Sequence, residues 1–184
     1  MPRLQAINPG IAEGKARELL DKVDAKYGRV PNLSRTLANS PSVLDAYLGF
    51  GALDDGSLSP ALREQIALAV SELNGCDYCL AAHSALGKMD GLSEEQVLDS
   101  RQALSVDRKA EAALKFAKAV VEKRGWVSDA DVARVRHAGY DDGEIAEIVA
   151  HVAKSMFANY FNHVADTDVD FPQVATLERP EGRL

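Results

Sequence analysis

The sequence predicts an all-α protein. Apolar residues recur at spacings of three and four over most of the 184 residues, which is the period of helices with one buried face. Serine, aspartate and proline residues stand where such helices would begin, and glycine residues stand where they would end. Alternating runs of β-branched residues, which would indicate strands, are almost missing. These observations favour a bundle of helices.

The first helices can be placed from their apolar spacing and their end signals. An apolar stripe over residues 12–27 predicts a helix that ends at Gly28. Pro31 and Pro41 then punctuate two shorter segments, and the second has apolar residues over 43–48.

The next helix has the clearest boundaries in the chain. Ser59-Pro60 is an N-cap serine followed by proline at the first helical position. Within residues 62–73 the run Ile66-Ala67-Leu68-Ala69-Val70 is wholly apolar, so we expect this helix to be buried on most sides. Asn74-Gly75 is a natural C-terminal break, because glycine adopts the left-handed conformation without steric cost.

The second half of the chain predicts further helices and a tail. Gly87 and Gly91 mark a turn. The expected helices after it are a short one opened by the capping box Ser93-Glu94-Glu95-Gln96, one over 110–121 stopped by Gly125, a short one over 128–139, and a long one over 142–165. From about residue 166 to 184 we expect an irregular C-terminal arm, with Phe171 anchoring it on a neighbouring subunit.

Composition limits the classes of protein to consider. The length and a hydrophobic content of 46% suit a single domain over residues 1–184 with a sizeable core. A net charge of −7 opposes a nucleic-acid or membrane surface, since both need clustered lysine and arginine. No apolar run approaches the roughly 20 residues of a membrane helix, and the first residues lack a signal-peptide pattern. We therefore expect a cytoplasmic protein without nucleic-acid or membrane partners.

The two cysteines form the most informative motif. Cys76 and Cys79 are separated by two residues, and His83 follows four residues after the second. In a cytosolic protein such a pair is more often catalytic, redox-sensing or metal-binding than a static bridge. If a helix begins just before the motif, Cys76 lies at its N-terminus, where the helix dipole favours a thiolate. Cys79 and His83 then share one face.

A carboxylate in the preceding helix extends this motif. Glu64 stands twelve positions before Cys76, near the start of the helix that carries the apolar run 66–70. Burying an unpaired charge is costly, so this carboxylate needs a partner. A tight turn at Asn74-Gly75 would place Glu64 beside the helix that carries His83. The result would be a Glu–His–Cys relay, although Glu64 could instead be a first-turn carboxylate favoured by the helix dipole.

Two other interpretations of the cysteines stay open. Free cysteines are often small hydrophobic residues of a core. Alternatively, Cys76, Cys79 and His83 could bind zinc, with Glu64 or His151 as a fourth ligand. Structural zinc usually takes a second Cys or His pair at matching spacing, and the sequence has none.

The order and spacing of Glu64, Cys76, Tyr78, Cys79 and His83 resemble the signature of the alkylhydroperoxidase D-like (AhpD-like) proteins. These proteins belong to the carboxymuconolactone decarboxylase superfamily. The core resemblance runs over about 59–88, and the tail over 159–172 resembles the peroxidase-related branch. The resemblance implies an AhpD-like helical bundle with the Cys-x-x-Cys on a helical hairpin. It also implies a redox-active cysteine pair and homo-oligomers, either trimers or hexamers. One departure is Tyr78, where the best-described members carry histidine, a better proton carrier at neutral pH.

These observations lead us to expect a thiol-dependent hydroperoxide reductase. Its expected catalytic residues are Cys79, Cys76, His83, Glu64 and Tyr78. Glu64 would accept a proton from His83, His83 would lower the pKa of Cys79, and Tyr78 would complete the hydrogen-bond path. Cys79 would attack the hydroperoxide and Cys76 would close the disulfide, with the reverse order also open.

The electrons must come from outside the chain. The sequence has no flavin, haem or nicotinamide motif, so we expect no cofactor and an external thiol or protein reductant. Other interpretations are a protein disulfide reductase, a non-catalytic redox sensor, or a zinc-stabilised protein. A decarboxylase-type lyase is a further alternative, but that chemistry does not use a cysteine pair.

Overall fold

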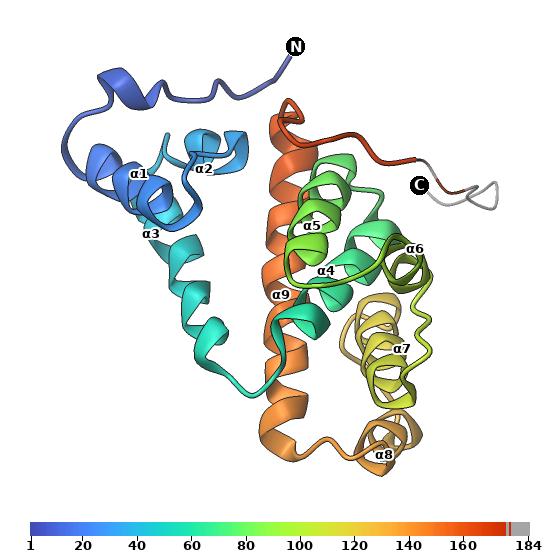
Figure 1. The fold of residues 1–184 in the computed structure, drawn as a ribbon. Helices are drawn as coiled ribbons and strands as arrows, with labels where there is room; N and C mark the ends of the chain where they lie inside the picture. The colour runs from blue at the N-terminus through green and yellow to red at the C-terminus, as the bar shows by residue number, and fades with distance from the viewer. Residues whose placement is uncertain (176, 178–184) are drawn as a thin grey trace.

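The computed structural model describes residues 1–175 and 177, and this part of the chain is helical without strands, as predicted (Figure 1). Its elements in chain order are η1 (Pro9–Ile11), α1 (Gly14–Tyr27), α2 (Asn32–Leu37), α3 (Pro41–Gly49), η2 (Phe50–Asp55), α4 (Pro60–Asn74), α5 (Asp77–Met89), α6 (Glu94–Arg101), α7 (Arg108–Glu122), α8 (Asp129–His137) and α9 (Asp142–Ala165). Among these helices, none is both long enough and apolar enough to cross a bilayer.

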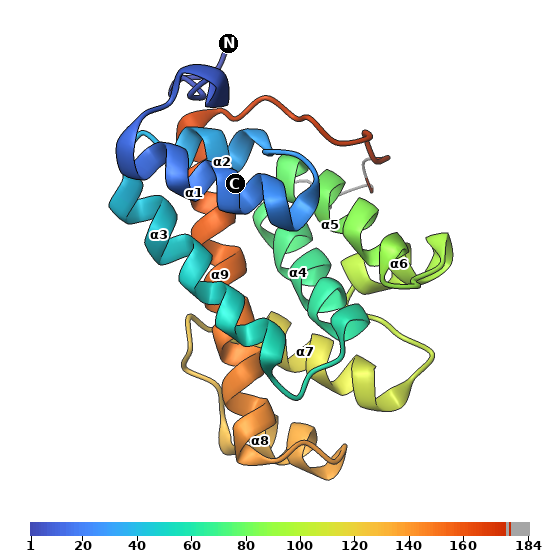
Figure 2. The ribbon, with the colours of Figure 1, turned by 60° about the vertical axis from the view of Figure 1, so that its left-hand side comes forward.

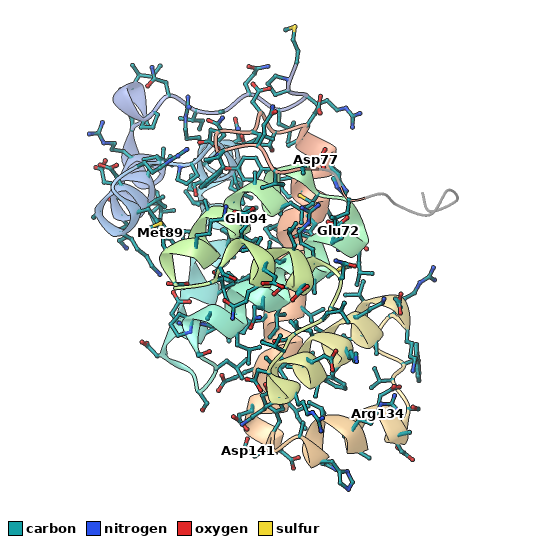
Figure 3. The ribbon with its side chains drawn as sticks, turned by 45° about the vertical axis from the view of Figure 1, so that its right-hand side comes forward. Glu72, Asp77, Met89, Glu94, Arg134 and Asp141 are labelled. Atoms are coloured by element: carbon teal, nitrogen blue, oxygen red, sulfur yellow. The ribbon has the colours of Figure 1, made fainter. Side chains whose placement is uncertain are left out.

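Helix α4 is the centre of the bundle. Helices α5, α6, α7 and α9 all pack against it, which explains why its sequence is apolar on nearly every side (Figure 1). Ile66, Leu68 and Val70 are fully buried although they point in different directions around the helix. A buried ion pair at 2.7 Å between Glu72 of α4 and Arg101 of α6 adds a polar contact to this packing (Figure 3).

Helices α1, α2 and α3 form a second group, which packs on α9 and on the cysteine-containing end of α5 (Figure 2). Leu20 of α1, Leu37 of α2 and Leu44 of α3 contribute to one apolar cluster that also contains both cysteines. The motif therefore lies in the interior of the protein, between the central hairpin and this group.

The hairpin of α4 and α5 forms as the sequence predicts. The Ser59 hydroxyl accepts a hydrogen bond from the Leu62 N–H at 3.3 Å, and Pro60 occupies the first turn. Gly75 has φ +68°, which lets the chain reverse directly after α4. Cys76 is then the N-cap residue of α5. The capping box predicted at Ser93 and the residues after it is also confirmed.

The predicted turn at Gly87 is wrong. This residue lies inside α5, and the turn is made by Gly91, which has φ +94°. Gly87 is buried, and a Cβ atom there would approach the Leu92 side chain to 2.9 Å and the Cβ of Glu64 to 3.5 Å. The missing side chain thus allows α5 to lie close to α4 at the level of Glu64.

The described part of the C-terminal arm has no regular secondary structure after α9. Phe171 is an anchor, as expected, but its partners belong to the same chain. Its ring packs edge-on against Tyr78 at 5.7 Å, and the Arg29 guanidinium lies 4.6 Å from the ring centre. Asp170 pairs with Arg29 and accepts a hydrogen bond from the Asn32 N–H at 3.1 Å. Residues 176 and 178–184 of the predicted arm lie outside the described residues.

Candidate active site

The two cysteines are adjacent, reduced and buried. Their sulfur atoms lie 2.7 Å apart, and each residue is 1% exposed. The Cys76 Sγ caps α5 by accepting a hydrogen bond from the Cys79 N–H at 3.4 Å. A disulfide needs a sulfur–sulfur distance of about 2.05 Å, so a small movement would join the pair. The geometry suits reversible dithiol–disulfide chemistry.

The two thiols have opposite pKa shifts. The pKa of Cys76 is lowered, first by its side-chain hydrogen bond with Cys79 and also by the Cys79 backbone N–H. The pKa of Cys79 is raised well above its ordinary value, first by burial. The N-cap position of Cys76 gives this difference a physical cause, because free N–H groups at a helix start stabilise negative charge. The first proton lost by the pair therefore leaves the charge on Cys76.

Helix α9 contacts the motif through two asparagines. Asn162 donates a hydrogen bond to the Cys79 Sγ at 3.2 Å. Asn159 accepts a hydrogen bond from Asn74 at 2.8 Å and donates one to the Ser71 hydroxyl at 3.2 Å. Both asparagines are at most 4% exposed. They hold the end of α4 and the start of α5 in place, a role that the sequence did not assign to them.

The predicted contact between Glu64 and His83 is present. The Oε2 atom of Glu64 on α4 lies 2.7 Å from the Nδ1 atom of His83 on α5. Their side chains are 17% and 21% exposed, so the pair lies at the edge of the core. The hydrogen bonds of the described residues do not join His83 to either sulfur. A proton moving between His83 and the thiols therefore needs a further step.

Tyr78 makes contacts on another side of α5. Its hydroxyl accepts a hydrogen bond from the Leu33 N–H of α2 at 3.1 Å, and its ring meets Phe171. The residue is 4% exposed, and burial is the first cause that raises the pKa of the phenol. These contacts connect α5 to α2 and to the C-terminal arm, whereas the sequence placed Tyr78 on the path to His83.

A cavity of about 560 Å³ opens beside Glu64 and His83. Its walls come from α1, α3, η2, α4, α5 and α9, and Met89 lies at its exposed edge (Figure 3). Tyr47 of α3 is also in the wall. Burial is the first cause that raises the pKa of Tyr47, so its hydroxyl stays protonated and can donate a hydrogen bond. The sequence showed Tyr47 only as an apolar helix position.

The residues considered as zinc ligands do not converge. Within residues 1–175 and 177, no three His, Cys, Asp or Glu side chains are grouped as a metal would require. His151 lies on α9, lines the cavity and is 4% exposed. Burial is the first cause that lowers its pKa, to about 4, so it is neutral at neutral pH.

Comparison with known proteins identifies the family. Residues 41–123, which run from α3 through α7 and include the hairpin, match the carboxymuconolactone decarboxylase family. A crystal structure described as an alkylhydroperoxidase AhpD core, from an uncharacterised peroxidase-related protein of Ralstonia eutropha JMP134, has a TM-score of 0.81 and 27% identity over 92% of each chain. These matches place residues 41–123 in the carboxymuconolactone decarboxylase family and show that the chain has an AhpD-like fold.

Two more distant structures share the AhpD-like fold. A peroxidase-related protein from Silicibacter sp. TM1040 has a TM-score of 0.77 and 22% identity, over 91% of this chain and 94% of that one. The debrominase Bmp8, bound to 2,3,4-tribromopyrrole, has a TM-score of 0.78 and 20% identity over 91% of each chain. Identities this low show the fold alone. A search of curated proteins gives no match.

The neutral, buried state of His151 in this AhpD-like protein predicts a dependence of stability on pH. Its pKa is about 4 when folded and 6.5 in the ordinary state, so the unfolded chain binds the extra proton first as pH falls. The stabilisation is present above pH 6.5 and is lost as pH falls toward 4. Between pH 7 and pH 4.5, we expect the free energy of unfolding to fall by about 2 kcal/mol less in His151→Gln than in the wild type.

Urea unfolding of both proteins at the two pH values measures this difference. Carboxylates titrate in the same range, and comparing the variant with the wild type removes their common contribution. Parallel losses in the two proteins would show that His151 does not contribute.

Proposed function

We propose that this protein is a thiol-dependent hydroperoxide reductase that cycles between a Cys76/Cys79 dithiol and a disulfide. One observation carries the proposal: the two reduced sulfurs lie 2.7 Å apart, and the one that caps α5 has a lowered pKa. The Glu64–His83 pair lies on the same hairpin and lines a cavity large enough for a small substrate. Neither cysteine is among the described residues that form the wall of this cavity, so the peroxide must pass from it to the sulfurs. The AhpD-like family and its peroxidase-related structural neighbour support the same chemistry.

The reaction begins with proton transfer. His83, held by Glu64, takes a proton from the thiol pair, directly or through water, and the charge rests on Cys76. The Cys76 thiolate attacks the terminal peroxide oxygen, so a sulfur–oxygen bond forms and the oxygen–oxygen bond breaks. Sulfur is oxidised to sulfenic acid, and the peroxide is reduced to an alkoxide. The alkoxide takes back the proton from His83 and leaves as an alcohol.

The disulfide closes in the second half of the cycle. Cys79 attacks the sulfenic sulfur of Cys76, the sulfur–sulfur bond forms, and the hydroxyl leaves as water with the Cys79 proton. The short distance between the sulfurs and the bond from Asn162 to Cys79 favour this step. A small external thiol then restores both Cys76 and Cys79 by exchange and leaves as its own disulfide, because a folded protein partner could not reach the buried sulfurs.

This order of attack reverses the first expectation from the sequence. The sequence favoured Cys79 as the attacking residue because His83 follows it by four positions, and it left the other order open. The structure gives Cys76 the lower pKa, and the thiolate is the reactive form of a cysteine. We also propose that Tyr78 positions α5 through its contacts with Leu33 and Phe171. The hydroxyl of Tyr47, in the cavity wall, then donates the hydrogen bond to the peroxide.

Burial of the sulfurs favours a peroxide over a protein disulfide as the oxidant. Each cysteine is 1% exposed, so a folded protein partner could not bring its disulfide to them without opening the bundle. A hydroperoxide is small enough for the cavity beside His83. A protein disulfide reductase would be oxidised by protein disulfides and would ignore hydroperoxides, which separates the two functions. The homo-oligomer and the cytoplasmic location stay predictions.

Single cysteine variants test the order of attack. In Cys79→Ser, the remaining thiolate should be oxidised by one equivalent of hydroperoxide and stop at a sulfenic acid, because its resolving thiol is missing. Dimedone labelling followed by mass spectrometry should place the adduct on Cys76. Cys76→Ser should give no adduct under the same conditions. An adduct only in Cys76→Ser would restore Cys79 as the attacking residue.

Glu64→Gln tests the proton-transfer pair. The change preserves size but removes the carboxylate from His83, so we expect the rate of peroxide reduction to fall on the order of 10²-fold. Glu94→Gln is the matched control, because Glu94 is an exposed carboxylate on the neighbouring helix α6 (Figure 3). Circular dichroism should show the same helix content in both variants. Equal rates for the two variants would leave Glu64 with a structural role only.

A further inference from the structure

The cavity beside Glu64 and His83 contains polar groups that the peroxide chemistry does not use. His151 and Lys154 stand three residues apart on α9, and both line the cavity. The Nε2 atom of His151 is buried and has no hydrogen-bond partner among the described residues. Lys154 is half-buried and makes no hydrogen bond or ion pair within the same part of the chain. A buried polar group without a partner is costly, so both groups would gain from a ligand.

The other charged residues of the cavity wall differ from Lys154. Lys26 bonds to Asp54 at 2.7 Å, and Arg63 lies 3.7 Å from the same carboxylate. Lys22 and Asp90 are exposed and carry opposite charges. Burial is the first cause that lowers the pKa of Lys154, which shows that its ammonium has lost part of its hydration. The Asp54 and Glu64 carboxylates act on Lys154 only through space, without a hydrogen bond or ion pair. A half-buried cation of this kind, beside a neutral imidazole, suits a ligand group with one negative charge.

The rest of the wall suits a hydrocarbon. The apolar surface of the wall comes from Tyr47, Leu48, Leu86 and Met89. The volume of about 560 Å³ lies within the range of small-molecule sites, which combine apolar walls with a few polar groups that fix orientation. A ligand of this shape has an apolar body and one anionic end.

We propose that the cavity binds organic hydroperoxides that carry a carboxylate, an inference that rests on the proposed reductase function. Lys154 forms an ion pair with the carboxylate, and the neutral imidazole of His151 lies beside it in the cavity wall. The hydrocarbon body lies against Tyr47 and Leu86. The peroxide group is then held near Glu64 and His83.

The anchor can be tested without catalysis. The probe is 4-isopropylbenzoate, which has the carboxylate and the apolar body but no peroxide, and titration calorimetry measures its affinity. We expect Lys154→Met to weaken binding about tenfold or more, because it removes the counter-ion of a partly desolvated carboxylate. Lys154→Arg should restore most of the affinity, and Lys22→Met, at an exposed lysine of the same cavity, should keep the wild-type value. Equal affinities in the wild type and Lys154→Met would overturn the anchor.

Kinetics connect the anchor to the reaction. The substrates are cumene hydroperoxide and its para-carboxylate derivative, which differ only in the anionic group. We expect the wild type to have a higher kcat/KM for the carboxylate, and Lys154→Met to reduce this preference about tenfold, mainly through KM. An unchanged preference would contradict the proposal. If neither peroxide is consumed, the reductase function fails, and the calorimetric result still decides whether the carboxylate site exists.

Discussion

A carboxylate in an apolar helix must find a partner, and the α4–α5 hairpin is built around this constraint. Glu64 lies on the central helix of the bundle and is paired with His83 across the hairpin at 2.7 Å. The pairing requires α5 to reverse directly after α4, which Gly75 allows, and to approach α4 closely, which Gly87 allows. The same reversal makes Cys76 the N-cap of α5. The position of the thiols and the position of the proton acceptor thus follow from one local geometry.

Helix α9 completes the site from outside the hairpin. Near its C-terminus, Asn159 and Asn162 bond to the turn and to Cys79, and one to three turns earlier His151 and Lys154 face the cavity. A single helix therefore supports both the redox centre and the proposed substrate anchor. Polar side chains on a buried helix face are costly unless they are satisfied. Here the asparagines bond to the hairpin, and Lys154 has the anchoring role that we propose for it.

The hairpin could be predicted because its signals are local. Ser59-Pro60, the apolar run after it and Asn74-Gly75 fix the helix and its reversal, and the spacing of Glu64, Cys79 and His83 then indicates which faces meet. The remaining features depend on contacts between distant segments. The partner of Tyr78 is the backbone of α2, forty-five residues away in sequence. In the sequence Gly87 resembles a turn residue, and its place inside α5 depends on the close packing of Leu92. Tyr47 has its proposed role because α3 brings it to the cavity.

The central claim is that the two cysteines are a redox couple that a hydroperoxide oxidises. Intact-mass spectrometry after one equivalent of hydroperoxide per chain tests it most directly, with peptide mapping to locate the change. The account predicts that both thiols disappear together and that the mass falls by about 2 Da, with a Cys76–Cys79 disulfide in the map. An unchanged mass with both thiols still titratable, or a gain of about 16 Da per oxygen on methionine alone, would contradict it.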